Sequence, residues 1–288
     1  NPPIDPIREK KVMSLNQYIG RLGNILKKIN EKKSNKFIEL EQPILYREKI
    51  EKIKSVEVDT LRSITIPIIF EADQYEKGLS IALDALKKRV EDSILQGYRI
   101  IILSDSDVDR YRAPIPSILA VSTVHNYLIK KKLRTKVDLI IETGEARDPF
   151  HMALLLGYGA TAVYPYIALE SINYLVKNRL YIDNITVKEA SMNFVRALGY
   201  GIRKITSKMG ISTLRSFNGA QIFEVIGLDE ELVNEHFAGT PCRLSGLKMD
   251  GIAKEILVRH NAAFDMNVKT NPLKIGGEID WRTNGETH

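Results

Sequence analysis

Cysteine is almost absent from this chain of 288 residues, which has a single one at Cys242. One cysteine excludes a disulfide within the chain, and it excludes a zinc or iron–sulfur site built from several cysteines. Aromatic residues make up only 7% of the chain and do not interleave with the basic runs, so they offer no stacking platform for nucleic acid. No apolar run approaches the roughly 18 residues that indicate a membrane-spanning helix.

Familiar nucleotide and metal motifs are missing as well. No G-x-G-x-x-G segment follows a predicted strand, and there is no Walker loop. The five histidines never fall at the spacing of metal ligands, and His125 lies among apolar neighbours, which favours a packing role. His236 is near Cys242 in sequence, but a catalytic thiol also needs an electropositive setting, so we interpret Cys242 as a packed residue. The first residues lack the basic and apolar regions of a signal peptide, and we expect them to be a cut within a longer chain.

The net charge of +6 raises the question of nucleic-acid binding. The basic residues gather in short runs, several of them on the backs of helices or near helix C-termini, where cations complement the helix dipole. These runs are Lys27–Lys36, Lys49–Lys54, Lys87–Arg89 and Lys130–Lys136. We interpret them as solvated faces, and we expect neither a nucleic-acid partner nor a membrane.

The chain is organised around residues 99–166. Arg99–Ser104 is an unbroken run of mostly β-branched residues, which is typical of a strand buried on both faces of a parallel sheet. Further predicted strands and helices alternate with it: a helix at Pro116–Lys132, a strand at Val137–Ile141, a helix through Met152–Leu156 and a strand at Thr161–Tyr164. This order predicts right-handed crossovers and an α/β fold, a parallel β-sheet with flanking helices. Whether the sheet is an open layer or an incomplete β/α barrel is left open.

Elements are also predicted on both sides of this centre. Before it we expect a helix from Ile7 to about Gly20, a strand at Phe37–Leu40, a helix from Pro43 to about Lys54, a strand at Ser63–Phe70 with Pro67 at an edge or a strand start, and a helix at Gly78–Leu95 ended by Gly97. After it we expect helices at Ile167–Lys177, Val187–Lys208 (with a Thr186–Glu189 capping box and interruptions at Gly199 and Gly201), Gln221–Val225, Glu230–Phe237 and Gly251–His260, with a strand or loop at Met209–Phe217.

Chemistry in parallel α/β folds gathers where the strands end, and two polar loops follow predicted strands here. In the first, Asp105, Asp107 and Asp109 alternate like part of a calcium-binding loop, but the glycine and terminal glutamate of that loop are absent. Asx-turn and N-cap hydrogen bonding is the preferred interpretation.

The second loop is Glu142-Thr-Gly-Glu-Ala-Arg147. Glu142, Glu145 and Arg147 could hold a carboxylate or a phosphate, or they could form an ion-pair cluster among themselves. A third candidate is Lys208-Met-Gly-Ile-Ser-Thr213, where a lysine, a glycine and two hydroxyls follow a long helix and could meet an anion.

Several longer segments carry a resemblance that composition alone does not. They are Asn1–Glu9, Val12–Leu15, Ile102–Asp105, Arg112–Ser117, Glu142–Arg147, Leu156–Ala160, Ser207–Thr213 and Gly219–Gly227. Together and in this order they resemble the central domain of the glutamate synthase large subunit. The resemblance covers essentially the whole chain, and Gly276-Gly-Glu with Trp281-Arg is similar to the join where the flavin-binding domain of that family begins.

The resemblance implies one domain of a larger enzyme. In that family an amidotransferase domain hydrolyses glutamine, and ammonia travels through a tunnel to a β/α-barrel domain with FMN and an iron–sulfur cluster, where 2-oxoglutarate becomes glutamate. The central domain links the two and is an incomplete relative of the flavin barrel. The resemblance further implies a central domain at residues 1–275, a linker at 276–288, ferredoxin or an NAD(P)H-dependent small subunit as electron donor, and a cytoplasmic or plastid location.

No catalytic, cofactor-binding or metal-binding residue of the family can be transferred to this chain, since residue 1 is Asn and the cysteine cluster is absent. We expect a scaffold that binds no flavin, with interdomain or tunnel surface at Glu142, Thr143, Glu145, Arg147, Lys208, Ser212 and Thr213. The alternatives are a free-standing α/β enzyme or a binding domain for a phosphate or small carboxylate at the strand ends.

Overall fold

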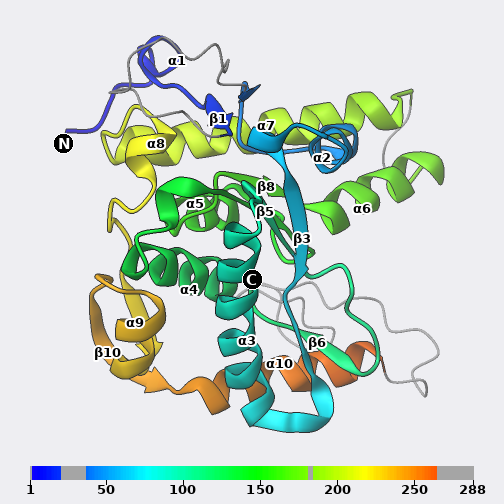
Figure 1. Ribbon diagram of the computed structural model, residues 1–288. Coiled ribbons are helices and arrows are strands. Elements are labelled where there is room, and N and C mark those ends of the chain that lie inside the picture. Colours follow the sequence, from blue (N-terminus) through cyan, green and yellow to red (C-terminus); the bar gives the residue numbers. More distant parts are fainter. Residues whose placement is uncertain (1, 21–36, 181–183, 265–288) are drawn as a thin grey trace, which may run out of the picture.

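A computed structural model describes residues 2–20, 37–180 and 184–264 of the chain (Figure 1). Its centre is a parallel sheet of four strands: β3 (Ser63–Pro67), β5 (Ile100–Ser104), β7 (Asp138–Glu142) and β8 (Ala162–Tyr164). Every residue of β5 and β8 is buried, as the continuous aliphatic runs require. The predicted α/β fold with a parallel sheet is confirmed. The linker predicted at 276–288 lies outside the described residues, as does the lysine-rich run up to residue 36.

The strand order is β3–β5–β7–β8, so each strand lies beside the one before it in the sequence. In this register Ile101 pairs with Ile64 on one side and with Leu139 on the other. A doubly wound sheet reverses its strand order at a switch point, whereas a β/α barrel adds its strands in one direction. The four strands show no switch point, so their order matches four consecutive strands of a β/α barrel, and we call this sheet with its helices the half-barrel.

Three helices connect successive strands of this sheet and pack side by side: α3 (Tyr75–Leu95), α4 (Ser117–Lys130) and α5 (Pro149–Gly157). Two more helices follow, α6 (Tyr166–Lys177) and α7 (Val187–Lys208), and α7 packs against both α5 and α6 (Figure 1). Among the helices of the three described ranges, none is long and apolar enough to cross a membrane.

Helix α7 is continuous, so the interruption predicted at Gly199 and Gly201 is wrong. A Cβ on Gly201 would lie 2.4 Å from Cγ of Pro149, and the missing side chain lets α5 approach α7 closely. The predicted capping box is present: the Glu189 amide donates to Oγ1 of Thr186 at 3.2 Å, and the Thr186 amide donates to Oε2 of Glu189 at 3.0 Å.

The edge of the sheet at β8 is closed by residues 43–45. The Val163 amide donates to the Pro43 carbonyl at 2.9 Å, and the Leu45 amide donates to the Val163 carbonyl at 2.8 Å. Because this segment is extended, helix α2 (Arg47–Lys54) begins four residues later than the predicted start at Pro43. Helix α2 then contacts β3, the strand at the opposite edge.

Strand β3 ends at Pro67, and β4 (Ile69–Glu71) forms a separate antiparallel pair with β6 (Arg112–Pro114). The single strand predicted at Ser63–Phe70 is therefore divided, and the predicted edge position of Pro67 is confirmed. Short 3₁₀ turns lie at Asp59–Leu61, Ala72–Gln74 and Arg134–Lys136.

The C-terminal part adds a small parallel pair, β9 (Val225–Leu228) and β10 (Cys242–Leu247), joined by α9 (Glu230–His236). Helix α10 (Met249–Ala263) packs along α3. The helix predicted at Gln221–Val225 is absent because Gln221 has φ +53°, which ends any helix, and Val225 starts β9. Cys242, interpreted as a packed residue, is the first residue of β10 and is half-buried.

The predicted helix from Ile7 to Gly20 is wrong. The structure has one short helix, α1 (Glu9–Val12), followed by β1 (Gln17–Ile19), which pairs with β2 (Ile38–Leu40). In the strand region Leu15, Gln17 and Ile19 are buried while Asn16 and Tyr18 are exposed, a period of two. The same apolar residues fit both periods, and pairing with β2 decides between them.

Candidate functional site

Four side chains meet at the carboxyl edge of the sheet, where β5 and β7 end and α4 begins. Oγ1 of Thr143 donates to Oδ2 of Asp105 at 2.7 Å, and the Gly144 amide donates to both oxygens of the same carboxylate at 3.0 Å. The Ser117 hydroxyl lies 2.5 Å from that of Thr143, and the Ser117 amide donates to Oε2 of Glu145 at 2.7 Å. The strand-end loops thus hold one another through a hydrogen-bond network, here called the strand-end network: Asp105, Ser117, Thr143, Gly144 and Glu145. Asp105, Ser117 and Thr143 are buried, whereas Glu145 is exposed.

Burial raises the pKa of Asp105 to about 6, even though hydrogen bonds from Thr143, Gly144 and Tyr166 favour the carboxylate; the charge of Glu145 adds to the rise. Burial and the charge of Asp105 raise the pKa of the Tyr166 hydroxyl. The phenol therefore remains protonated at neutral pH and can donate to Asp105.

Glu142 points to a different partner, Lys54 at the end of α2. Nζ of Lys54 lies 3.0 and 3.2 Å from the two carboxylate oxygens, and the Glu142 side chain is only 9% exposed. An ion pair with one buried member ties α2 to the centre of the sheet. Sequence reasoning placed Glu142 at the strand end but missed Lys54, which lies 88 residues earlier in the chain.

Replacing Lys54 by Met should lower the free energy of unfolding by about 2 kcal/mol, because it leaves the Glu142 carboxylate buried without its cation. Lys54 is itself 29% exposed, so part of the full cost of a buried charge is screened. Urea unfolding, followed by hydrogen exchange of β7, measures the change. Lys52→Met on the exposed face of α2 is the control, and adding Glu142→Gln should restore part of the loss. Equal effects of Lys52→Met and Lys54→Met would contradict the pairing.

Arg147 lies beside the network rather than in it. It lines a cavity of about 430 Å³ together with Glu145, His151 and Arg259, which brings the end of β7 next to α10. In the described ranges Arg147 forms no ion pair with Glu142 or Glu145, so the predicted cluster of these three is not present. Glu142, Thr143, Glu145 and Arg147 are brought to one edge, but with separate partners.

The other predicted residues, Lys208, Ser212 and Thr213, do not line this cavity. They lie where the N-terminal segment crosses the end of α7: the Ile4 amide donates to the Ser207 carbonyl at 2.9 Å, and the Ser14 amide donates to the Ser212 carbonyl at 2.8 Å. Thr213 is the N-cap of α8 (Leu214–Phe217), and Lys208 is exposed.

Glu9 anchors this crossing and was not predicted. Its carboxylate accepts from Oγ of Ser207 at 2.9 Å and lies 3.0 Å from Nζ of Lys204, and the hydrogen bond from Lys204 lowers its pKa. We call residues 207–213 with the attached N-terminal segment the docking strip. The sequence around Glu9 gave no signal for this role.

The aspartate loop makes local hydrogen bonds. Asp109 accepts from the amides of Tyr111 and Arg112 at 2.9 Å and pairs with the Arg112 guanidinium, which lowers its pKa. Asp105 belongs to the strand-end network, and no group of three or more possible metal ligands is found within residues 2–20, 37–180 and 184–264. The Asx-turn interpretation is confirmed for Asp109.

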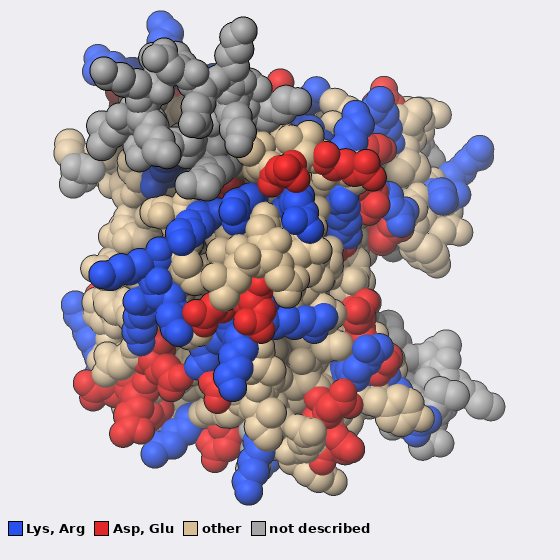
Figure 2. Space-filling view, in the orientation of Figure 1, with Lys and Arg blue, Asp and Glu red and all other residues tan. Residues whose placement is uncertain are grey.

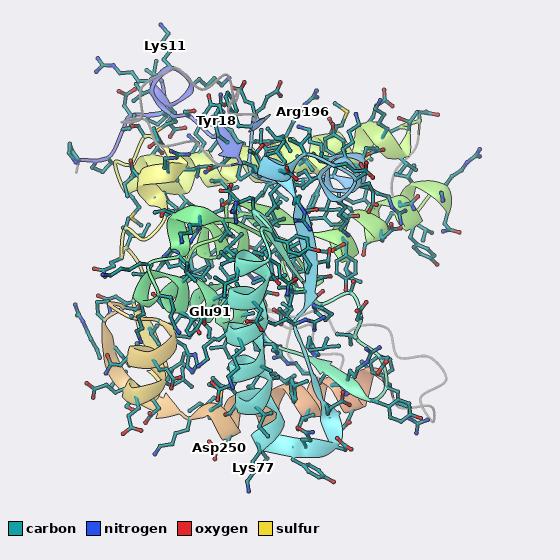
Figure 3. The ribbon with its side chains drawn as sticks, viewed as in Figure 1. Lys11, Tyr18, Lys77, Glu91, Arg196 and Asp250 are labelled. Atoms are coloured by element: carbon teal, nitrogen blue, oxygen red, sulfur yellow. The ribbon has the colours of Figure 1, made fainter. Side chains whose placement is uncertain are left out.

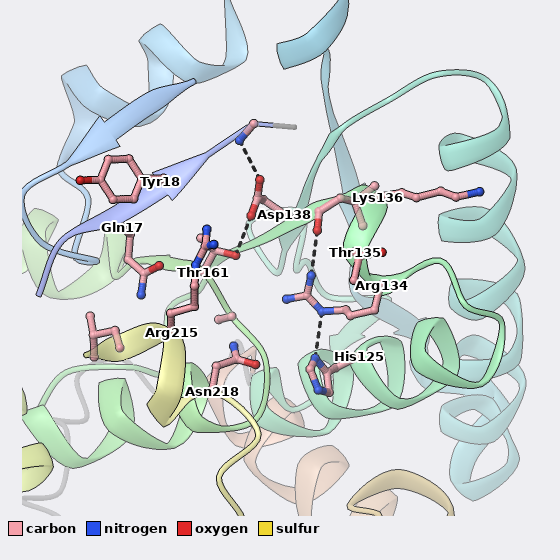
Figure 4. Close-up of a pocket in the computed structure, with 14 residues that line it drawn as sticks. Gln17, Tyr18, His125, Arg134, Thr135, Lys136, Asp138, Thr161, Arg215 and Asn218 are labelled. Atoms are coloured by element: carbon pink, nitrogen blue, oxygen red, sulfur yellow. Dashed lines mark hydrogen bonds between the residues drawn. The ribbon is translucent and has the colours of Figure 1, made fainter. Parts of the chain in front are cut away.

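The opposite, amino end of the sheet holds a second polar cluster that sequence reasoning missed (Figure 4). The guanidinium of Arg134, a half-buried residue, donates to Nδ1 of His125 at 2.9 Å and to the carbonyls of Val137 and Gly159 at 2.7 and 2.8 Å. Burial lowers the pKa of His125 to about 4, and the charge of Arg134 adds to this, so His125 is neutral. The predicted packing role of His125 is confirmed.

Asp138 completes this amino end, accepting from the Gly20 amide at 2.8 Å and from Oγ1 of Thr161 at 3.3 Å. Burial raises its pKa. A cavity of about 340 Å³ lies between these groups, as Figure 4 shows. The cluster joins β1, β7 and the turn before β8.

The helix N-termini at the carboxyl edge decide whether a flavin phosphate fits there. Such a phosphate needs free amides at a helix start. The start of α4 is occupied by the carboxylate of Glu145, and the start of α5 is capped by Asp148, which accepts from the amides of Phe150 and His151 at 2.8 and 2.9 Å. Carboxylates therefore occupy the starts of α4 and α5, so these two helix starts do not fit a phosphate, and the one cysteine of the chain does not suit an iron–sulfur cluster.

Fold and site together define an α/β half-barrel domain whose strand-end carboxylates are bound by its own side chains and amides. A family described as "Glutamate synthase central domain" matches residues 1–229. The chain belongs to this family, and the resemblance found in its motifs is confirmed.

Curated relatives match along the whole chain. It is 39% identical to "Glutamate synthase [NADH]" of Schizosaccharomyces pombe, 37% to "Glutamate synthase [NADPH] large chain" of Bacillus subtilis and 37% to "Ferredoxin-dependent glutamate synthase" of Pyropia yezoensis. All of this chain is covered, but only 14%, 18% and 19% of those proteins. The chain thus spans less than a fifth of their length.

Among solved structures, a flavocytochrome b2 variant with benzoylformate aligns at a TM-score of 0.38 and 14% identity, over 60% of this chain and 37% of the other. A mandelate oxidase variant aligns at 0.35 and 14% identity, over 58% and 42%. These alignments are loose and add nothing to the strand order as evidence of the fold.

Proposed function

We propose that this chain is the linking domain of a glutamate synthase, holding an amidotransferase domain and a synthase domain at a fixed distance. The whole enzyme makes glutamate from glutamine and 2-oxoglutarate, with FMN and an iron–sulfur cluster in the synthase domain. Electrons come from ferredoxin or from an NAD(P)H-dependent subunit, in the cytoplasm or a plastid. The relatives, named as glutamate synthases and five to seven times longer than the matched segment, support this proposal.

One observation carries the linking role: the acids of the strand-end network are engaged by internal partners. Asp105 accepts from Thr143 and Gly144, and Glu145 accepts from the start of α4. A free general acid or base needs access to a substrate proton, whereas these groups brace three loops against one another. A rigid edge of this kind suits a scaffold.

Two surfaces are our choices for contact with neighbouring domains. The first is the docking strip, in which residues 207–213, with Lys208, Ser212 and Thr213 among them, bind the N-terminal segment. In this proposal the chain arrives from an amidotransferase domain along that segment. The cavity at the carboxyl edge, lined by Glu145 and Arg147 and reached by α10, faces the synthase domain and contributes to the ammonia path, with Glu142 and Thr143 behind it.

The test is the coupling of the two half-reactions in the whole enzyme. Arg147→Glu and Lys208→Glu should each leave glutamine hydrolysis intact but lower the glutamate formed per glutamine hydrolysed, because a reversed charge weakens domain docking by about 1 kcal/mol. Released ammonia, glutamate and glutamine are measured in one assay. Arg89→Glu on the exposed face of α3 is the control. An unchanged ratio in both variants would remove these residues from the interdomain surface.

A further inference from the structure

A separate cavity of about 490 Å³ lies between α2, α7 and the segment before α2. Its volume is in the range of sites for small molecules. One wall is a stripe of α7 at helical spacing, with Met192, Val195, Arg196, Gly199, Tyr200 and Arg203, and the facing wall is Leu15, Glu41, Gln42, Tyr46 and Lys49. Figure 3 marks Arg196 on this outer side of α7.

The cations of this cavity differ from their neighbours on the same helices. Next to Arg203 on α7, Lys204 pairs with Glu9, and on α2 Arg47 pairs with Glu170. In contrast, no carboxylate of the described residues lies within 4.0 Å of the side-chain nitrogens of Lys49, Arg196 or Arg203. The face of the molecule in Figure 2 carries acidic as well as basic side chains.

Arg203 supplies the second observation. Its Nε is buried and has no hydrogen-bond partner among the described atoms. A buried N–H on a charged group is costly to leave unpaired, more so than for a neutral group. Arg203 lines the cavity, and since its Nε is closed off, an acceptor bound there would pair with the terminal nitrogens of the guanidinium and offset part of this cost.

Charge and spacing indicate what such an acceptor is. Arg196 and Arg203 are two helical turns apart, which separates their Cα atoms by about 10 Å, and Lys49 approaches from α2. With three cations and the single carboxylate of Glu41, the cavity carries a net charge of +2. Planar guanidinium groups bind carboxylates through two parallel hydrogen bonds, and two of them set apart match two separated carboxylates.

We propose that this cavity binds a small aliphatic dicarboxylate. One carboxylate is held by the terminal nitrogens of Arg203, and the other by Arg196 and Lys49. The methylenes of the ligand contact Met192 and Val195. The site is distinct from the strand-end network and does not depend on the linking role.

The test uses glutarate as the probe on the protein at its full natural length, with binding measured by equilibrium dialysis and located by hydrogen exchange of peptides over 41–49 and 192–203. Glutarate should slow exchange in both segments, and the concentration dependence of that protection gives the affinity of this cavity separately from binding at the 2-oxoglutarate site of the proposed synthase domain. Arg203→Gln and Arg196→Gln should each weaken binding about tenfold or more, the loss expected for charge-assisted hydrogen bonds. Arg196 is exposed, so Arg196→Gln keeps the test valid should Arg203→Gln unfold. The matched control, Arg89→Gln on α3, should bind glutarate as the unchanged protein does.

Three results would overturn the proposal. The first is no slowed exchange in 41–49 and 192–203 at millimolar glutarate. The second is butyrate or inorganic phosphate binding as tightly as glutarate, which would mean that the cavity responds to charge alone. The third is equal affinity in Arg196→Gln and the unchanged protein.

Discussion

Replacing Gly159 by alanine should lower the free energy of unfolding by about 3–5 kcal/mol, because it adds backbone strain to a steric clash. Gly159 has φ +127°, a conformation that L-residues rarely adopt, and it lies in the turn between α5 and β8. A Cβ there would lie 2.5 Å from Nδ1 of His125, the atom that accepts from Arg134. The ring cannot move away without breaking that hydrogen bond. We therefore expect the hydrogen bonds of Arg134 with His125 and Gly159 to be lost when the turn is distorted.

A second glycine separates the two penalties. Gly219 also has a positive φ, +72°, but a Cβ there would meet nothing within 4 Å. Gly219→Ala should therefore cost only about 1 kcal/mol, from strain alone. Urea unfolding with hydrogen exchange of the peptides around β7 and β8 measures both variants. If the two variants lose equal stability, the clash with His125 contributes nothing.

The stability of this domain should fall as the pH rises from 4 to 7, with Asp105 as the cause. Its pKa of about 6 in the folded chain lies above its ordinary value of 3.8. Between these two values the folded state holds a proton that the unfolded state has lost, so raising the pH favours unfolding. A shift of this size corresponds to at most about 3 kcal/mol, reached once the pH exceeds the folded pKa.

Asp105→Asn should remove this pH dependence, because the amide keeps an acceptor for the Gly144 amide and does not titrate. Urea unfolding midpoints are measured between pH 4 and 7 by hydrogen exchange of peptides from β5 and β7. They give the slope of stability against pH for each protein. Asp107→Asn, an exposed neighbour in the same loop, is the control and should keep the slope. A slope that survives in Asp105→Asn would assign the effect to another group.

The sequence predicts the centre of the fold well because one physical signal dominates there. Arg99–Ser104 and Val137–Ile141 have no polar alternation, so a strand buried on both faces is the only element that suits them. At Ile7–Gly20 the apolar spacing fits two periods, and the partner strand that decides between them is distant in sequence. Local pattern cannot report a distant partner.

The candidate site, too, could be predicted from the sequence only in part. Strand ends are visible in a sequence, and Glu142, Thr143 and Glu145 do gather at the carboxyl edge. Their partners are not visible: Lys54 meets Glu142, and Ser117 meets Glu145, only after the chain has folded. Arg134 was interpreted as part of a solvated basic run, yet it is half-buried and donates hydrogen bonds to His125, Val137 and Gly159 at the amino end of the sheet.

The contact between Glu9 and Ser207 spans 198 residues. A loop of that length closes late, since its ends must find each other after the intervening sheet and helices have formed. During synthesis Glu9 therefore lacks its partner Ser207 until α7 has emerged from the ribosome. In the folded protein this contact lies outside the central sheet. We expect it to break first when the chain is pulled. Tension applied to the N-terminal segment would accordingly break the contact between Glu9 and Ser207 while the half-barrel stays folded.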